Sequence, residues 1–353
     1  MERMSLLYQF LGYTPENYNR VSPAQYELLI CLTRQQVDDN LLHSWTPIVG
    51  SLEHNIALFC SEGLIEEASL EEKFDSKFRV SDIKSLLDKH SISVNPKARK
   101  SEMIARYLDS IPLTAAAGEV ADIRLYRATG EGKKRLEFYL AQKEMARKTM
   151  EASAMAYLMN GDLTRAGQRI ALHETQQIFP RGPGIDWSKG MPEACLRMAA
   201  YILSNDYSEL PMLESQRKEV GAKLALSALL GETYADAGKR ILDTSNGEFG
   251  WTVFGNVLRT NSCCGYAATC NLDDPLEIAQ LYARMRMSEA CTNMDLEKLA
   301  TTRLGKGIKI LPANGNHCIS CTRGKHQYSW SEIQSLPRLP RQWGCLCTYS
   351  AWI

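Results

Sequence analysis

The sequence predicts a mainly α-helical protein with small helical modules at its N-terminal end, a helical middle domain and a loop-rich C-terminal module that carries cysteines. Three observations support this fold class. Apolar residues recur at helical spacing along most of the chain, as between Tyr26 and Leu32. A proline- and glycine-rich stretch at 180–184 interrupts the helical pattern. Cysteines close the chain as two pairs, at 318–321 and 345–347.

The composition is that of an ordinary soluble globular protein, with 44% hydrophobic and 23% charged residues among 353. This length is sufficient for two or three domains. The 41 basic and 41 acidic residues give a net charge of zero. Proteins that bind nucleic acid mainly through bulk charge are usually basic, so any such binding must come from a local patch.

No membrane span and no secretory signal are expected. The chain has no run of about 18 consecutive apolar residues. Its first residues lack the basic start, apolar run and small-residue cleavage site of a secretory signal. We therefore expect a cytoplasmic protein whose eleven cysteines are mostly reduced.

Residues 1–77 are predicted to form a small helical or winged-helix-like module. Ser22-Pro23 is a typical helix start, and Gly63 is expected to end a second helix. Leu64-Ile65 then continues as an extended pair.

Residues 78–110 are predicted to form a helical hairpin. Ser81 is expected to cap the first helix, and a polar turn from Ser91 to Ser101 leads to the second. The small-residue segment at 111–122, which contains Pro112, is predicted to be a linker.

Residues 123–310 are predicted to form the helical middle domain. The segment 131–178 is mostly helical, and the stretch 247–270 is the least regular part. Further helices are expected around 192–204, 213–230, 232–242 and 275–302. No period of 20–50 residues repeats, which argues against a solenoid.

The hairpin at 78–110 resembles the SAP motif, a short helix–turn–helix of DNA-associated proteins. The residues that match the motif are Ser81, Ile83, Lys84, Leu86, Leu87, Ile92, Glu102, Ile104, Arg106 and Leu108. From Lys77 to Asp109 the chain has eight basic and four acidic residues, so the segment is locally cationic. The turn lacks the glycine that usually precedes the lysines in this family, and it is longer by about two residues.

Five cations of the hairpin are the predicted DNA contacts: Lys84, Lys97, Arg99, Lys100 and Arg106. Cationic side chains beside helix N-terminal amides suit phosphate oxygens and do not read base identity. The expected binding is therefore weak, independent of DNA sequence and strongly dependent on salt. The alternative is a plain helical hairpin with solvated basic side chains.

Residues 311–353 are predicted to form a zinc-type module. Cys318, Cys321, Cys345 and Cys347 form two close pairs whose sulfurs suit a tetrahedral Zn²⁺ ion. Four sulfurs leave no position for water, so such a site is structural. A nearby histidine in place of one sulfur (His317 or His326), two disulfides, or unpaired thiols are the alternatives.

This tail also resembles the cysteine segment of phage head-morphogenesis (minor capsid) proteins. A CxxC pair, a Gly-aromatic stretch, a Leu-Pro-x-x-Pro run and a closing CxC occur in the same order. Arg341-Gln342-Trp343 stands where that family commonly has a histidine. The resemblance implies a role in assembling a phage head.

Other candidate sites are weaker. The cysteines at 263, 264 and 270 fit no standard ligand spacing, and we interpret them as buried or incidental thiols. His173-Glu174 on an apparent helix is interpreted as surface or helix-pair residues, with a general-base role as the alternative. The turn at 181–187 lacks the features of a phosphate-binding loop.

Together these features favour a cytoplasmic DNA-associated binding or adaptor protein with a protein partner or self-association. A phage- or prophage-derived assembly protein is one alternative. Another is a nuclease-type effector whose catalytic residues the sequence does not identify, so enzymatic activity is left open.

Overall fold

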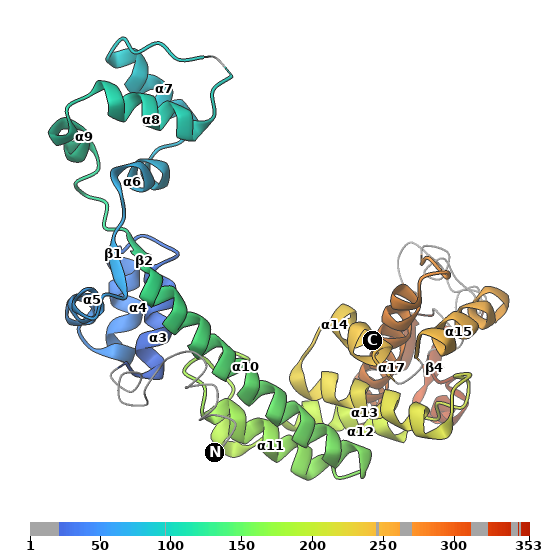
Figure 1. Ribbon diagram of the computed structural model, residues 1–353. Helices are drawn as coiled ribbons and strands as arrows, with labels where there is room; N and C mark the ends of the chain where they lie inside the picture. Colours follow the sequence, from blue (N-terminus) through green and yellow to red (C-terminus); the bar gives the residue numbers. More distant parts are fainter. Residues whose placement is uncertain are drawn as a thin grey trace. The chain divides into compact units, whose positions relative to one another are not determined.

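The computed structural model describes residues 21–95, 97–244, 247–261, 270–311, 324–339, 345 and 347–353. The protein is mainly helical, as predicted (Figure 1). It divides into two compact units, residues 1–145 and 146–353. The boundary lies inside the long helix α10 (Gly130–Met159), so the predicted middle domain has its first residues in the first unit.

The first unit contains a small helical bundle. It consists of α3 (Pro23–Leu32), α4 (Asp39–Val49) and α5 (Leu52–Ser61), which pack with the start of α10. Ser22 caps α3 as predicted, because its hydroxyl accepts a hydrogen bond from the Gln25 amide at 3.3 Å. Tyr26 stacks on Tyr139 of α10 with ring centroids 4.9 Å apart.

Two three-residue strands connect this bundle to the rest of the unit. The strand β1 (Ile65–Glu67) pairs antiparallel with β2 (Tyr126–Ala128), and Glu66 lies opposite Arg127. The chain therefore leaves the bundle along β1 and returns along β2. Residues 68–125 are an insertion between two paired strands, and we call them the inserted module.

The inserted module has a hydrophobic core of its own. Its helices are α6 (Leu70–Lys77), α7 (Val80–Lys89), α8 (Lys100–Ser110) and α9 (Leu113–Glu119). Its buried core residues are Phe74, Ile83, Leu87, Met103, Ile104, Tyr107, Ala116, Val120 and Ile123. All of them lie within the insertion, so the module buries its apolar surface without residues from the bundle.

Two local predictions in this region are wrong. Arg79, not Ser81, is the N-cap of α7, and the Asp82 carboxylate accepts a hydrogen bond from the Arg79 amide at 2.8 Å. The predicted linker at 111–122 contains the helix α9, whose Ala116 is fully buried. Small residues carry no apolar stripe, but they allow α9 to pack closely on the module core.

The second unit is a helical bundle with an appended sheet. Its helices are α11 (Leu163–Thr175), η1 (Trp187–Lys189), α12 (Glu193–Ser204), α13 (Glu214–Leu230), α14 (Tyr234–Leu242), α15 (Gly247–Asn261) and α17 (Pro275–Thr302). The helix α13 is buried almost throughout from Val220 to Leu230 and lies in the core. The prediction of irregular structure at 247–270 is wrong for the part that forms α15.

Across the described residues, no helix combines the length and apolar character needed to cross a membrane, and this includes α10 and α17.

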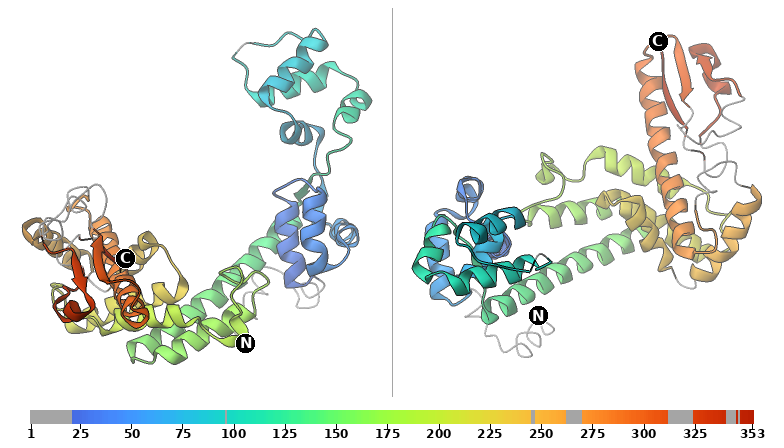
Figure 2. Two further views of the ribbon diagram at one scale, coloured as in Figure 1. Left: turned by 180° about the vertical axis from the view of Figure 1, so that it is seen from behind. Right: turned by 90° about the horizontal axis from the view of Figure 1, so that it is seen from above.

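A three-stranded antiparallel sheet lies beside the C-terminal part of α17 (Figure 2). The central strand β3 (Gly307–Leu311) pairs with β4 (Gln327–Ser329) on one side and β5 (Thr348–Trp352) on the other. The short helix η2 (Trp330–Ser335) follows β4. Leu296 and Leu299 of α17 pack against the apolar side of this sheet.

Candidate nucleic-acid interface

The helices α7 and α8 run in the same direction within the inserted module. His90, at the end of α7, packs edge-on against Tyr107 near the end of α8, with ring centroids 5.7 Å apart. At the other end, Lys100 at the start of α8 contacts Asp75, which lies just before α7 in the chain. The segment 90–99 therefore returns from the end of α7 to the start of α8 (Figure 1). Both helix starts lie at one end of the module.

Four of the five predicted DNA contacts are exposed. Lys84, Lys97, Arg99 and Arg106 present their side chains to solvent. Within the described residues none of the four side chains forms an ion pair. Arg106 lies within α8, whereas Arg99 is its N-cap residue.

The fifth predicted contact, Lys100, is engaged within the module. Its ammonium lies 2.9 Å from a carboxylate oxygen of Asp75 and donates to the Asp75 carbonyl at 2.5 Å. The Lys100 side chain is only 27% exposed. The structure thus leaves Lys84, Lys97, Arg99 and Arg106 exposed and sets Lys100 apart from them.

Sequence reasoning missed one cation at this end of the module. Arg79, the N-cap of α7, is exposed and lies at the same end of the parallel helix pair as Arg99. The signal that identifies it is Asp82, because an acidic residue at the third helical position marks the residue three before it as the N-cap. We call Arg79, Lys97 and Arg99 the cationic end.

The backbone amides at this end are partly occupied by the chain's own carboxylates. Glu102 accepts a hydrogen bond from the Arg99 amide at 3.0 Å, as Asp82 does from Arg79. The Lys97 amide donates to the side chain of Asn95 at 2.9 Å. A phosphate would therefore meet cationic side chains first, and the helix-end amides that the sequence suggested contribute less.

Half of the predicted zinc site lies outside the described residues, since Cys318, Cys321 and the alternative ligand His317 belong to that part of the chain. Cys345 and Cys347 are each 3% exposed and belong to the apolar core of the tail. The other alternative ligand, His326, accepts a hydrogen bond from the Ile310 amide through its backbone carbonyl at 2.8 Å.

Cys345 and Cys347 also line a cavity of about 270 Å³ against α17, together with Cys291 and Asp295. In the part of the chain that the structure describes, no three His, Cys, Asp or Glu side chains are grouped so that they could hold a metal ion. The four-cysteine zinc site therefore stays a prediction.

His173 and Glu174 are both buried on α11, and Glu174 anchors the turn that follows this helix. The Glu174 carboxylate accepts hydrogen bonds from the backbone amide and the Nε of Arg181, at 2.8 and 2.7 Å. The guanidinium of Arg181 also donates to the carbonyl of Leu230, at the end of α13. Trp187 donates from its ring nitrogen to the Arg181 carbonyl at 2.8 Å. These contacts hold the turn at 181–187 against the bundle.

The cysteines at 263 and 264 lie outside the described residues. Burial, followed by the charge of Glu277, raises the pKa of the Cys270 thiol to about 11. A thiol with this pKa stays protonated near neutral pH and is a poor nucleophile.

Comparisons of the chain with protein-family models, with curated proteins and with solved structures find no match. The grounds for its function are therefore the residues described above, chiefly the cationic end of the inserted module and the cysteines of the tail.

Proposed function

We propose that this protein binds double-stranded DNA through phosphate contacts at the cationic end of the inserted module, and that it acts as a DNA-associated adaptor. One observation carries the proposal. The parallel arrangement of α7 and α8 brings Arg79, Lys97 and Arg99 to one exposed end of a module that has its own core. Such a group of cations suits the closely spaced phosphates of a duplex.

The binding is weak and independent of DNA sequence. Phosphate contacts position a protein on DNA but carry no base information. Each phosphate contact contributes about 0.9 to the slope of log affinity against log salt. Three contacts thus predict a loss of roughly 40-fold in affinity between about 50 and about 200 mM salt.

The tail supplies the second part of the proposed function. We propose that Cys318, Cys321, Cys345 and Cys347 hold a structural Zn²⁺ ion. Support comes from the burial of Cys345 and Cys347 in one apolar core. The bound ion would cross-link a short segment that has little core of its own. A tail folded in this way offers a surface for a protein partner or for self-association in the cytoplasm.

Fluorescence anisotropy of labelled duplex DNA tests the proposed function. Two duplexes of unrelated sequence are titrated with the full chain at about 50 and about 200 mM salt. Similar affinity for both duplexes, with a steep loss at the higher salt, supports the proposal. Absence of binding at the lower salt contradicts it and favours the assembly alternative. Cleavage of the duplex after addition of Mg²⁺ favours the nuclease alternative.

A further inference from the structure

We infer that Asp75 restrains Lys100 and so withholds one cation from DNA. This inference rests on the proposed DNA binding at the cationic end. In the folded module Lys100 is bound twice by the same residue of α6, through the carboxylate at 2.9 Å and the carbonyl at 2.5 Å. Lys100 is the first residue of α8 and directly follows Arg99. Its ammonium is thus close to the proposed phosphate site, but it is bound to Asp75.

The packing of α6 on α8 does not depend on this ion pair. Phe74 of α6 is fully buried, and its ring centroid lies 5.4 Å from that of Tyr107 on α8. Ile104 of α8 is fully buried in the same core. The Asp75 carboxylate can therefore be neutralised, or lose its partner, while the two helices stay packed.

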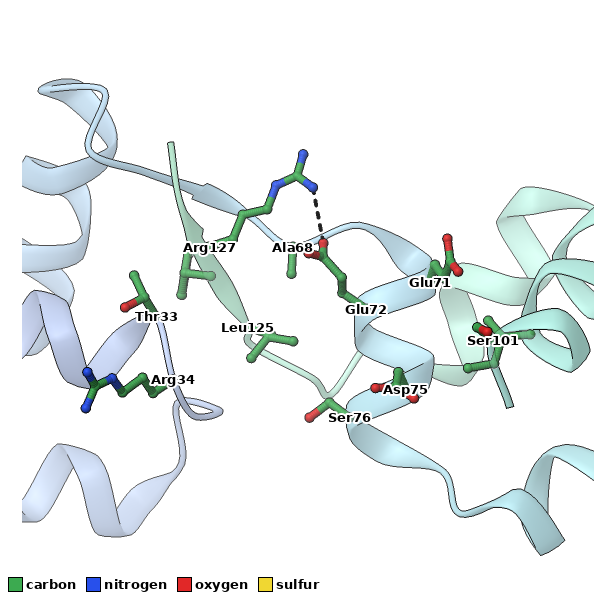
Figure 3. A pocket seen from close by; sticks show the side chains of 12 residues that line it. Thr33, Arg34, Ala68, Glu71, Glu72, Asp75, Ser76, Ser101, Leu125 and Arg127 are labelled. Atoms are coloured by element: carbon green, nitrogen blue, oxygen red, sulfur yellow. Dashed lines mark hydrogen bonds and ion pairs between the residues drawn. The ribbon is translucent and has the colours of Figure 1, made fainter. Parts of the chain in front are cut away.

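When the ion pair breaks, the Asp75 carboxylate can be solvated by water and the Lys100 ammonium can bind a phosphate. The Asp75 side chain is 64% exposed and lines a cavity of about 500 Å³, where Arg34 and Arg127 line the opposite side (Figure 3). Its carboxylate can thus remain hydrated without Lys100. The lysine side chain is long and flexible, so its ammonium can move from α6 to a phosphate beside Arg99.

The strength of the restraint follows from the exposure of the pair. An ion pair with one exposed partner is weak, so a phosphate can displace the carboxylate. Breaking the Lys100–Asp75 ion pair nevertheless costs free energy, and this cost lowers the affinity for DNA. Asp75 therefore acts as an internal competitor of the DNA phosphate, and the module binds DNA less tightly than its set of cations allows.

The test compares Asp75→Asn with Asp88→Asn in the full chain. Asp88 is an exposed acid on α7 that forms no ion pair within the described residues, so both substitutions make the same change in net charge. Affinity for a labelled duplex is measured by anisotropy at about 50 and about 200 mM salt. We expect Asp75→Asn to bind up to about fivefold tighter, with a salt slope steeper by about 0.9. Asp88→Asn is expected to leave the salt slope unchanged.

The Lys100→Ala substitution completes the experiment. In the Asp75→Asn background it should abolish the gain in affinity, and in the wild-type background its effect should be smaller. Equal behaviour of Asp75→Asn and Asp88→Asn, or a gain that survives Lys100→Ala, overturns the restraint while leaving DNA binding in place. Absence of binding by the wild type and by both asparagine variants at the lower salt overturns the proposed function as well. Unchanged thermal unfolding of Asp75→Asn shows that the module remains folded.

Discussion

The imidazole ring of His90, at the end of α7, packs edge-on against the ring of Tyr107 near the end of α8. The contact places the C-terminal ends of the two helices together, and a parallel pair has both N-termini at one end. An antiparallel hairpin of the same sequence would separate Arg79 from Arg99 by the length of a helix. The cationic end thus depends on the direction of α8 as much as on the number of lysines and arginines.

The Gly238→Ala substitution in α14 should destabilise the second unit. A Cβ atom at this position would lie 2.5 Å from the Cα of Gln280, where α14 crosses α17. Because backbone atoms cannot move aside easily, we expect a loss of roughly 1 to 3 kcal/mol in the free energy of unfolding. Denaturant titration followed by circular dichroism measures this change.

The matched control is Gly118→Ala in α9, where a Cβ atom would meet nothing within 4 Å. Alanine favours a helix over glycine, so this variant should be as stable as the wild type or more stable by up to about 1 kcal/mol. Equal destabilisation by the two substitutions would contradict the close crossing of α14 and α17.

The stability of the second unit should fall in mild acid because of His173. Burial lowers the pKa of this imidazole below its ordinary value near 6.5. The unfolded chain therefore binds a proton more readily than the folded protein, and stability falls as the pH drops below about 6.5. Thermal unfolding midpoints between pH 7 and pH 5 should decrease.

Two variants separate His173 from other acid effects. His173→Gln removes the titrating ring and should flatten the dependence over this pH range. His43→Gln, at an exposed position, is the control for replacing a histidine by glutamine. A steep decrease that persists in His173→Gln would assign the acid sensitivity to other groups.

The zinc prediction has a direct test in metal content. Protein purified without chelators should contain about one zinc ion per chain, and Cys345→Ser should lose it and expose the tail to proteolysis. Cys291→Ser is the matched control, because Cys291 lines the same cavity but is not a predicted ligand. A wild-type protein without zinc, or equal zinc loss in both variants, would contradict the four-cysteine site.

Much of the helical structure was predictable because its signals are local. The Ser22-Pro23 start, the glycine after α5 and the apolar stripes of the second unit each depend on neighbouring residues. The predicted helix at 275–302 has the limits of α17, and that predicted at 213–230 begins one residue before α13.

The insertion was not predictable from local patterns. The strands β1 and β2 have three residues each, and their pairing joins positions 61 residues apart, such as Glu66 and Arg127. So short a strand has no distinctive pattern of its own. The Ala-rich segment of α9 was missed for a related reason, since its burial depends on the core that other helices supply.

The candidate interface was predictable in composition but not in arrangement. Lys97 and Arg99 belong to the basic turn and are exposed, and their contact with DNA stays a prediction. The pairing of Lys100 with Asp75 depends on the docking of α6 onto α8, which links residues 25 positions apart. The burial of Glu174 likewise depends on Arg181, which follows it after a turn.

The most direct test of the central claim compares the two ends of the inserted module. Arg79→Ala and Arg99→Ala remove cations from one end. Lys89→Ala removes a cation from the other end of α7, whose ammonium is exposed and lies 3.9 Å from Glu119. The measurement is the salt dependence of duplex DNA binding by the three variants of the full chain. The proposed interface predicts a slope reduced by about 0.9 for each arginine variant and an unchanged slope for Lys89→Ala. Equal reductions in all three variants would contradict a localised interface and indicate a diffuse attraction of charge.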